Sequence, residues 1–254
     1  MAGFSGNSDK PPVTEDRWIV NNGVRLHYIE SQCSSPVKLV PVVFIPGAMG
    51  AAELYLREIQ SLAPRRCIAI SLRGRGKSDA PEKGYTFEDH VSDIDSVVRH
   101  SDLKSYCLVG YSMGVPYAIE HAARNPNKVR GLVIGDYRAR APSMKPEWVE
   151  QSLAVPGAKP QAVRGLQRES REVVLWDRLK EIKSPVLVIR GGKPGSLLSA
   201  ENAELYRRHL SDVVIVQFED SDHALFKPSY ERYIGTIKDF LERHDQRPSP
   251  LGIV

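Results

Sequence analysis

A serine in a tight, glycine-flanked turn is the first residue of this chain that could do chemistry. Residues 110–114 read Gly-Tyr-Ser-Met-Gly and fit the pattern G-x-S-x-G around Ser112. The apolar run 106–109 before the turn is typical of a buried strand, and residues 118–123 after it carry apolar side chains at helical spacing. A strand, a sharp turn and a helix form a nucleophile elbow, which holds a serine in a strained conformation at a sheet edge. We therefore predict that Ser112 is a nucleophile; the alternative is that Ser112 only caps the following helix.

Three segments together resemble the α/β-hydrolase superfamily, particularly its small single-domain esterases and lactonases. They are the elbow, the Pro-Gly-Ala-Met-Gly segment 46–50 after an apolar run, and the Arg-Gly-Arg-Gly-Lys-Ser segment 73–78. The resemblance implies that the backbone amides of Ala48 and Met113 form the oxyanion hole. Pro46 stands where the family usually has histidine, and Ser71 stands where it has an acidic residue. Segment 73–78 does not have the spacing of a phosphate-binding glycine loop, so we expect it to be structural.

His223 is the histidine best placed to act as the base. A serine hydroxyl is a poor nucleophile unless a base lies within hydrogen-bond reach. His223 follows the last predicted strand and precedes the closing helix, which is where the resembled family carries its histidine. The other histidines fall in predicted strands or helices away from that edge of the sheet: His27, His90, His100, His121, His209 and His244.

The acid that would orient His223 departs from the usual pattern of the family. The family most often places the acid in the loop after the penultimate strand, here residues 191–198, which contain no carboxylate and have Ser196 at the expected position. Asp136 ends the strand that follows the elbow unit, and some relatives place their acid at that strand end. We predict Asp136 as the acid. The alternatives are that Asp136 only caps a turn beside a Ser–His pair, or that Asp220 or Asp222 is the acid.

The order of predicted elements indicates how these residues meet. Strands are predicted at 17–20, 24–29, 39–45, 66–72, 106–109, 129–135, 185–190 and 212–218, with helices at 51–62, 86–99, 200–210 and 230–243 and after the elbow. Two leading antiparallel strands followed by strand–helix units predict an α/β fold, a doubly wound and mostly parallel sheet of about eight strands. Ligands of such sheets bind beyond the carboxyl ends of the strands, where the candidate residues lie.

The predicted organisation is one core with one insertion. We expect the core at 14–137 and 185–244, a small helical lid at 138–184, a disordered tail at 1–13 and a flexible tail at 245–254. Short amphipathic runs at 147–153 and 161–169 predict helices in the lid. Seven Lys and Arg against three Glu between 138 and 171 would suit an anionic substrate, and a solvated surface explains them equally well.

Composition excludes several classes of protein. The net charge of the 254 residues is only +4 and no block of about five like charges occurs, so we expect no nucleic-acid partner. No run is long and apolar enough for a membrane span, and 1–12 lacks the apolar core of a signal peptide, so we expect a cytoplasmic protein. The three cysteines, Cys33, Cys67 and Cys107, have no metal-ligand spacing. A cluster of possible metal ligands, His90, Asp93, Asp95 and His100, has poor helical spacing, and we expect it on a solvated face.

The sequence therefore predicts a cofactor-free serine hydrolase that cleaves a small carboxylic ester or lactone through an acyl-enzyme on Ser112. We expect a monomer or a weak homodimer. The alternatives are a ligand-binding or sensor protein with a modified triad, or a repurposed fold acting as acyltransferase, thioesterase, C–C hydrolase or lyase. A halide-dependent reaction is disfavoured, because the predicted nucleophile is serine and not aspartate.

Overall fold

The centre of the molecule is a sheet of eight strands. The computed structural model describes residues 12–32 and 39–245, and the sheet has the order β1-β2-β4-β3-β5-β6-β9-β10. Its strands are β1 (Thr14–Asn21), β2 (Val24–Ser31), β3 (Val42–Ile45), β4 (Cys67–Ser71), β5 (Tyr106–Tyr111), β6 (Val129–Gly135), β9 (Val186–Gly191) and β10 (Val213–Phe218). β2 is antiparallel to β1 and β4, and the remaining pairs are parallel. The predicted fold class is confirmed.

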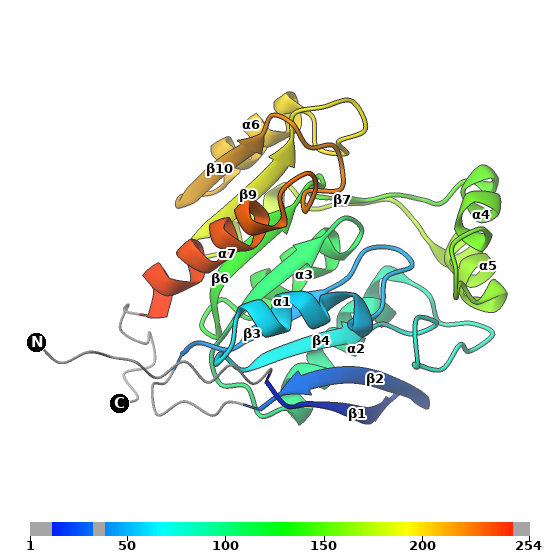
Figure 1. The fold of residues 1–254 in the computed structure, drawn as a ribbon. Coiled ribbons are helices and arrows are strands. Elements are labelled where there is room, and N and C mark those ends of the chain that lie inside the picture. The colour runs from blue at the N-terminus through cyan, green and yellow to red at the C-terminus, as the bar shows by residue number, and fades with distance from the viewer. Residues whose placement is uncertain (1–11, 33–38, 246–254) are drawn as a thin grey trace, which may run out of the picture.

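Helices cover both faces of the sheet, as Figure 1 shows. They are α1 (Leu56–Ser61), which follows a short 3-10 turn, η1 (Ala52–Tyr55), then α2 (Phe87–His100), α3 (Gly114–Arg124), α6 (Ala200–His209) and α7 (Tyr230–Asp245). One core lies between the sheet and α2, α3 and α6, and the other lies under α1 and α7. Successive residues of β3 alternate between the two cores, so its whole sequence is apolar.

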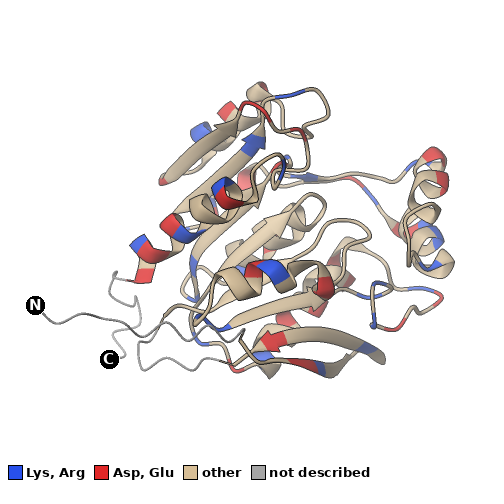
Figure 2. Cartoon of the chain, viewed as in Figure 1, with Lys and Arg blue, Asp and Glu red and all other residues tan. Residues whose placement is uncertain are grey.

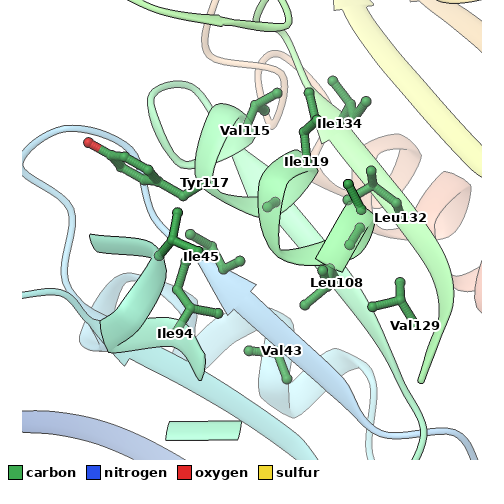
Figure 3. Packing of buried hydrophobic residues seen from close by; sticks show 14 of the residues in the cluster. Val43, Ile45, Ile94, Leu108, Val115, Tyr117, Ile119, Val129, Leu132 and Ile134 are labelled. Carbon is green, nitrogen blue, oxygen red and sulfur yellow. The ribbon is translucent and has the colours of Figure 1, made fainter. Parts of the chain in front are cut away.

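The packing around β5 fixes the strand that ends at the elbow. Val43 and Ile45 of β3, Leu108 of β5 and Ile119 of α3 pack together in the first core, as Figure 3 shows. Neither β3 nor β5 carries a charged residue, and Figure 2 shows the charged residues on helices, loops and other strands. β5 is therefore held by apolar contacts on both faces, and the elbow at its end has little freedom to move.

The register of the sheet brings the predicted site residues to one edge. Gly110 pairs with Ile45, and Tyr111 pairs with Gly135. Beyond the last pairs, the Ser112 amide donates to Gly135 O at 2.9 Å, and the Asp136 amide donates to Ile189 O at 2.8 Å. Residues far apart in the sequence thus leave the sheet side by side.

The insertion after β6 forms a small helical unit beside that edge. It contains a two-stranded sheet of β7 (Arg140–Ala141) and β8 (Val173–Val174), the helices α4 (Pro146–Leu153) and α5 (Pro160–Glu169), and the 3-10 turn η2 (Asp177–Glu181). In Figure 1, α4 and α5 lie off the end of the sheet on two connecting segments. A Cβ on Gly165 of α5 would lie 2.3 Å from the Tyr85 ring, so only glycine allows this helix to pack so closely on the core.

Local sequence signals explain several of the element boundaries. Asn22 and Gly23 have φ of 49° and 78°, as the predicted β1–β2 hairpin turn requires. Thr86 caps α2 and forms a reciprocal capping box with Asp89. Cys67 and Cys107 are buried in β4 and β5, and Cys33 lies outside the described residues. Within residues 12–32 and 39–245, no helix is both long enough and apolar enough to cross a membrane.

One predicted boundary needs a correction. The C-terminal tail was expected to begin at residue 245, yet Asp245 is the last residue of α7 and is held there by an ion pair. Both nitrogens at the end of the Arg65 side chain donate to its carboxylate, at 2.8 and 2.6 Å. Most of the predicted tails, 1–11 and 246–254, lies outside the described residues.

Candidate active site

Ser112 lies in a turn that only its glycine neighbours permit. Its φ of 53° places it in the left-handed region, which confirms the strained conformation predicted for an elbow. A Cβ on Gly114 would lie 2.4 Å from Ile45 O, and a Cβ on Gly110 would lie 2.9 Å from the Ala118 Cβ. The two glycines of the motif therefore let α3 turn back directly against β3 and β5, with Ser112 at the apex.

The structure brings Ser112, His223 and Asp136 into one chain of hydrogen bonds. His223 Nε2 lies 2.9 Å from Ser112 Oγ, and His223 Nδ1 lies 2.8 Å from Asp136 Oδ2. Tyr111 stacks on the His223 ring at 5.0 Å between centroids and donates its hydroxyl proton to the His223 carbonyl at 2.7 Å. Both ring nitrogens thus face a partner, and the Tyr111 side chain restrains the ring from one side.

Asp136 is a buried carboxylate surrounded by donors. It is 0% exposed, and it accepts hydrogen bonds from Ser196 Oγ at 2.6 Å, Leu197 N at 2.9 Å and Gly191 N at 3.1 Å, besides the His223 contact. Burial raises the pKa of Asp136, but the hydrogen bonds from His223, Ser196, Leu197 and Gly191 outweigh it and hold the pKa below its ordinary value. The carboxylate is therefore ionised at neutral pH and faces an imidazole.

The loop after β9 donates hydrogen bonds to the carboxylate of Asp136, which follows a neighbouring strand, β6. This loop lacks an acid, but Ser196 and Leu197 of the loop, with Gly191 at the end of β9, are the three donors other than His223 that bind Asp136. Sequence reasoning treated Ser196 as a missing acid and did not foresee its hydroxyl as a donor to Asp136. The alternative acids lie elsewhere: Asp220 pairs with Arg232, and Asp222 accepts from the Ala224 amide.

The Ser196 contact leads to a stability prediction. Ser196→Ala removes one charge-assisted hydrogen bond from a buried carboxylate, and we expect it to lower the free energy of unfolding by about 1–3 kcal/mol at neutral pH. Because the contact depresses the pKa of Asp136, its contribution is present above the ordinary carboxyl pKa and is lost as the pH falls through the folded-state value. Urea denaturation at neutral and acidic pH measures both effects. An equal loss at both pH values would contradict this account.

Hydrogen bonds hold the two peptide groups on either side of Ala48, in the segment predicted to contribute to the oxyanion hole. Gly47 O accepts from the Gly50 amide at 3.1 Å, which orients the peptide whose N–H belongs to Ala48. Ala48 O accepts from Nε of the buried Arg75 at 2.8 Å. Met113 precedes the first residue of α3, where backbone amides have no partner within the helix. The amides predicted for the oxyanion hole therefore belong to rigid segments next to Ser112.

The prediction that the possible metal ligands on α2 lie on a solvated face is wrong for two of them. His90 and Asp93 are both 0% exposed, because they bind arginines of segment 73–78. Asp93 accepts from Arg73 at 2.6 Å, and His90 Nε2 lies 2.8 Å from Arg75 Nη1 while its Nδ1 lies 2.7 Å from Thr86 O. Burial first and Arg75 second lower the pKa of His90, so it is neutral. These residues form a hydrogen-bonded network that supports segment 46–50 through the bond from Arg75 to Ala48 O.

A cavity of about 490 Å³ opens beside Ser112. It is lined by segment 46–50, by residues of η1 and α1, by Tyr111, by Val155 after α4, by Phe226 in the loop before α7, and by Tyr230 and Tyr233 at the start of α7. Its size suits a small ligand, and its walls are mainly apolar and aromatic. Val155 is the one residue of the insertion among those that line this cavity in the described part of the chain.

Several basic residues of the insertion make hydrogen bonds or ion pairs within the chain. Lys159 donates to Ser78 O, Arg168 donates to Glu82 O and Glu169, and Arg140 pairs with Glu172. Figure 2 shows charges of both signs on α4 and α5. Arg140 and Arg168 are therefore paired with acidic side chains of the insertion itself.

The fold and the site together agree with what comparison with known proteins shows. The chain belongs to the alpha/beta hydrolase fold family, whose model matches residues 40–218. It is similar to a haloalkane dehalogenase of Mesorhizobium japonicum, 33% identical over 113 residues, which are 44% of this chain and 35% of that protein. It is also similar to a 2-(acetamidomethylene)succinate hydrolase of the same organism, 24% identical over 222 residues, which are 69% of this chain and 78% of that protein.

Solved structures share the fold at low sequence identity. The structure of an N-acyl homoserine lactone degrading enzyme superimposes with a TM-score of 0.72 at 19% identity, covering 88% of this chain and 100% of that chain. Several curated relatives match over only about a third of their own length. The comparisons thus support a hydrolase of this family.

Proposed function

We propose that this protein is a cofactor-free serine hydrolase that cleaves a small carboxylic ester or lactone. The observation that carries the proposal is the continuous hydrogen-bonded chain from Ser112 through His223 to Asp136, next to a cavity of suitable size. A serine, a histidine and a buried carboxylate in this order form the machinery of acyl transfer.

Each residue has a role that its contacts support. Ser112 Oγ attacks the carbonyl carbon while His223 Nε2 takes its proton, and Asp136 stabilises the imidazolium that forms. The oxyanion of the tetrahedral intermediate lies against the amides of Ala48 and Met113. His223 returns the proton to the leaving oxygen, which gives an acyl-enzyme, and a water activated by His223 then releases the acid.

A ligand-binding protein with an inactive triad is the rival from another class. A missing acid would favour this rival, but Asp136 Oδ2 lies 2.8 Å from His223 Nδ1 and supplies a carboxylate. Pro46 in place of the usual histidine would also favour it, but that change affects a side chain, whereas the oxyanion hole uses backbone amides. Among enzymes, the serine at the elbow disfavours the halide chemistry named for one relative.

A fluorophosphonate probe tests the proposal directly. An activated serine reacts covalently with the phosphorus centre, so mass spectrometry is expected to show one adduct per chain, located on Ser112. Prior incubation with a small ester substrate should slow the labelling. A protein that stays unlabelled while a known serine esterase is labelled under the same conditions would support the ligand-binding rival.

A further inference from the structure

Arg75 is a buried cation that bonds to the segment predicted to contribute to the oxyanion hole. Its residue is 2% exposed, and its Nε donates to Ala48 O at 2.8 Å. Its Nη1 lies 2.6 Å from Arg73 O and 2.8 Å from His90 Nε2. Because a guanidinium only donates, His90 Nε2 is the acceptor, and His90 Nδ1 carries the proton that is donated to Thr86 O at 2.7 Å. All three partners of Arg75 are therefore neutral acceptors.

The positive charge of Arg75 is not cancelled by an ion pair. Asp93 is bound by Arg73 instead, from Nε at 2.8 Å and from Nη2 at 2.6 Å. Over the part of the sequence that the structure describes, no carboxylate bonds to Arg75, and the position of the usual acid is held by the buried, neutral Ser71. Burial lowers the pKa of Arg75, yet an arginine side chain stays protonated in a protein. A buried charge without a counter-ion is costly, which points to a role that a neutral side chain would not fill.

Two peptide groups meet at Ala48, and each is held by one hydrogen bond. The first carries the N–H predicted for the oxyanion hole, and its oxygen, Gly47 O, accepts from the Gly50 amide at 3.1 Å. The second carries Ala48 O, which accepts from Arg75. The cation thus lies within one residue of the amide that the proposed reaction uses, and it is in place before the reaction begins. A fixed positive charge in a buried site is well suited to stabilise a developing anion.

We propose that Arg75 is a positioning residue for the oxyanion hole, which fixes the backbone at Ala48 and stabilises, through it, the negative charge of the tetrahedral intermediate. This inference rests on the proposed function, because it gives Arg75 a part in the same acyl transfer. Arg75 does not touch the substrate, since Ala48 lines the cavity and Arg75 does not. The charge that it stabilises is absent from bound substrate, so Arg75 affects kcat and not KM.

Two substitutions at Arg75 test this role by kinetics. Arg75→Gln keeps an N–H donor and removes the charge, whereas Arg75→Met removes both and serves as the second variant if the first does not fold. With p-nitrophenyl acetate, we expect kcat to fall roughly 10- to 100-fold in either variant, less than the loss of an oxyanion donor itself, and KM to stay within about 2-fold. Rates are divided by the number of chains that a fluorophosphonate labels at its end point, so that misfolded protein is not counted.

Arg65→Gln is the matched control. Arg65 is also a buried arginine, 4% exposed, but it pairs with Asp245 and donates to Val40 O. It precedes β4, at the amino ends of the parallel strands, whereas Ser112 lies at their carboxyl ends. Its replacement should lower the free energy of unfolding and leave kcat per labelled chain unchanged.

A transition-state analogue tests the charge directly. An alkyl trifluoromethyl ketone forms a hemiketal, in which Ser112 Oγ bonds to the carbonyl carbon, the serine proton passes to His223 Nε2, and the carbonyl oxygen becomes the oxyanion. The matching trifluoromethyl carbinol has the same chain and cannot add the serine. Arg75→Gln should weaken binding of the ketone by about the factor that it takes from kcat/KM, and should leave the inhibition constant of the carbinol unchanged. A merely structural disturbance of the cavity would weaken both.

The outcomes separate this inference from the proposed function. A wild-type kcat in Arg75→Gln, equal weakening of ketone and carbinol, or an equal loss of kcat in Arg65→Gln would each overturn the role of Arg75. If the wild type hydrolyses no ester and binds the ketone no more tightly than the carbinol, the proposed reaction itself fails. If the wild type hydrolyses esters through Ser112 and Arg75→Gln does so equally well, only the inference about Arg75 fails.

Discussion

Replacing Ser112 by alanine is expected to abolish hydrolysis of short p-nitrophenyl esters. Without Oγ no acyl-enzyme forms, and kcat should fall by as much as about 10⁶-fold, the loss seen when a protease triad loses its serine. His223 and Asp136 keep each other as partners, so the rest of the site remains in place. The measurement is the initial rate with freshly purified variant, alongside circular dichroism to show that the fold is intact.

Glycine at the same position provides a control for the strained turn. Ser112 has a φ of 53°, which costs a residue with a Cβ roughly 1 kcal/mol and costs glycine almost nothing. Ser112→Gly should therefore be as inactive as the alanine variant and yet more stable than the wild type. Wild-type-like turnover by either variant would end the serine-hydrolase proposal.

Asp136→Asn should cause the second-largest loss, with kcat lower by up to about 10⁴-fold, as in a protease triad. Asparagine keeps the shape and tolerates the φ of 47° found at Asp136. Its amide nitrogen would face either His223 Nδ1 and the Leu197 amide or the Gly191 amide and Ser196 Oγ, because donors surround both carboxylate oxygens. Where the nitrogen faces His223, the imidazole loses the acceptor that fixes its tautomer. Steady-state kinetics over a pH range measures the effect.

The two nearby aspartates are matched controls for this change. Asp220 and Asp222 lie on the same loop as His223, but they bind Arg232 and the Ala224 amide. Asp220→Asn and Asp222→Asn should keep most of the activity. If Asp136→Asn also keeps it, Asp136 is not the acid, and a Ser112–His223 pair must act without one.

Features of the fold that depend on local backbone sterics and on patterns of burial could be predicted from the sequence alone. The elbow glycines, the hairpin at Asn22-Gly23 and the apolar strands follow from backbone sterics and alternating burial, and together they place Ser112, Asp136 and His223 at one edge. The choice of Asp136 needed one further step, namely that neighbouring parallel strands end side by side.

The remaining features depend on contacts between distant segments. His90 and Asp93 read as surface residues of a helix, and only the arginines of another loop explain their burial. Ser196 was interpreted only as the absence of an acid, because the carboxylate to which it donates lies 60 residues away in the sequence. Glu58 reads as a polar position of a short helix, and only the packing of α7 over it shows that it is buried.

The contact between Ser196 and Asp136 has an evolutionary consequence. Ser196 Oγ lies 2.6 Å from Oδ1 of Asp136, on the loop where related enzymes most often carry the acid. A carboxylate at position 196 would face Asp136 in a buried site, where two like charges cannot both ionise. A lineage that moves its acid between these strand ends must therefore pass through a pair of carboxylates sharing one proton, or through an ancestor with neither. The shared proton keeps one negative charge beside the histidine throughout, so it is the route along which catalysis survives every step.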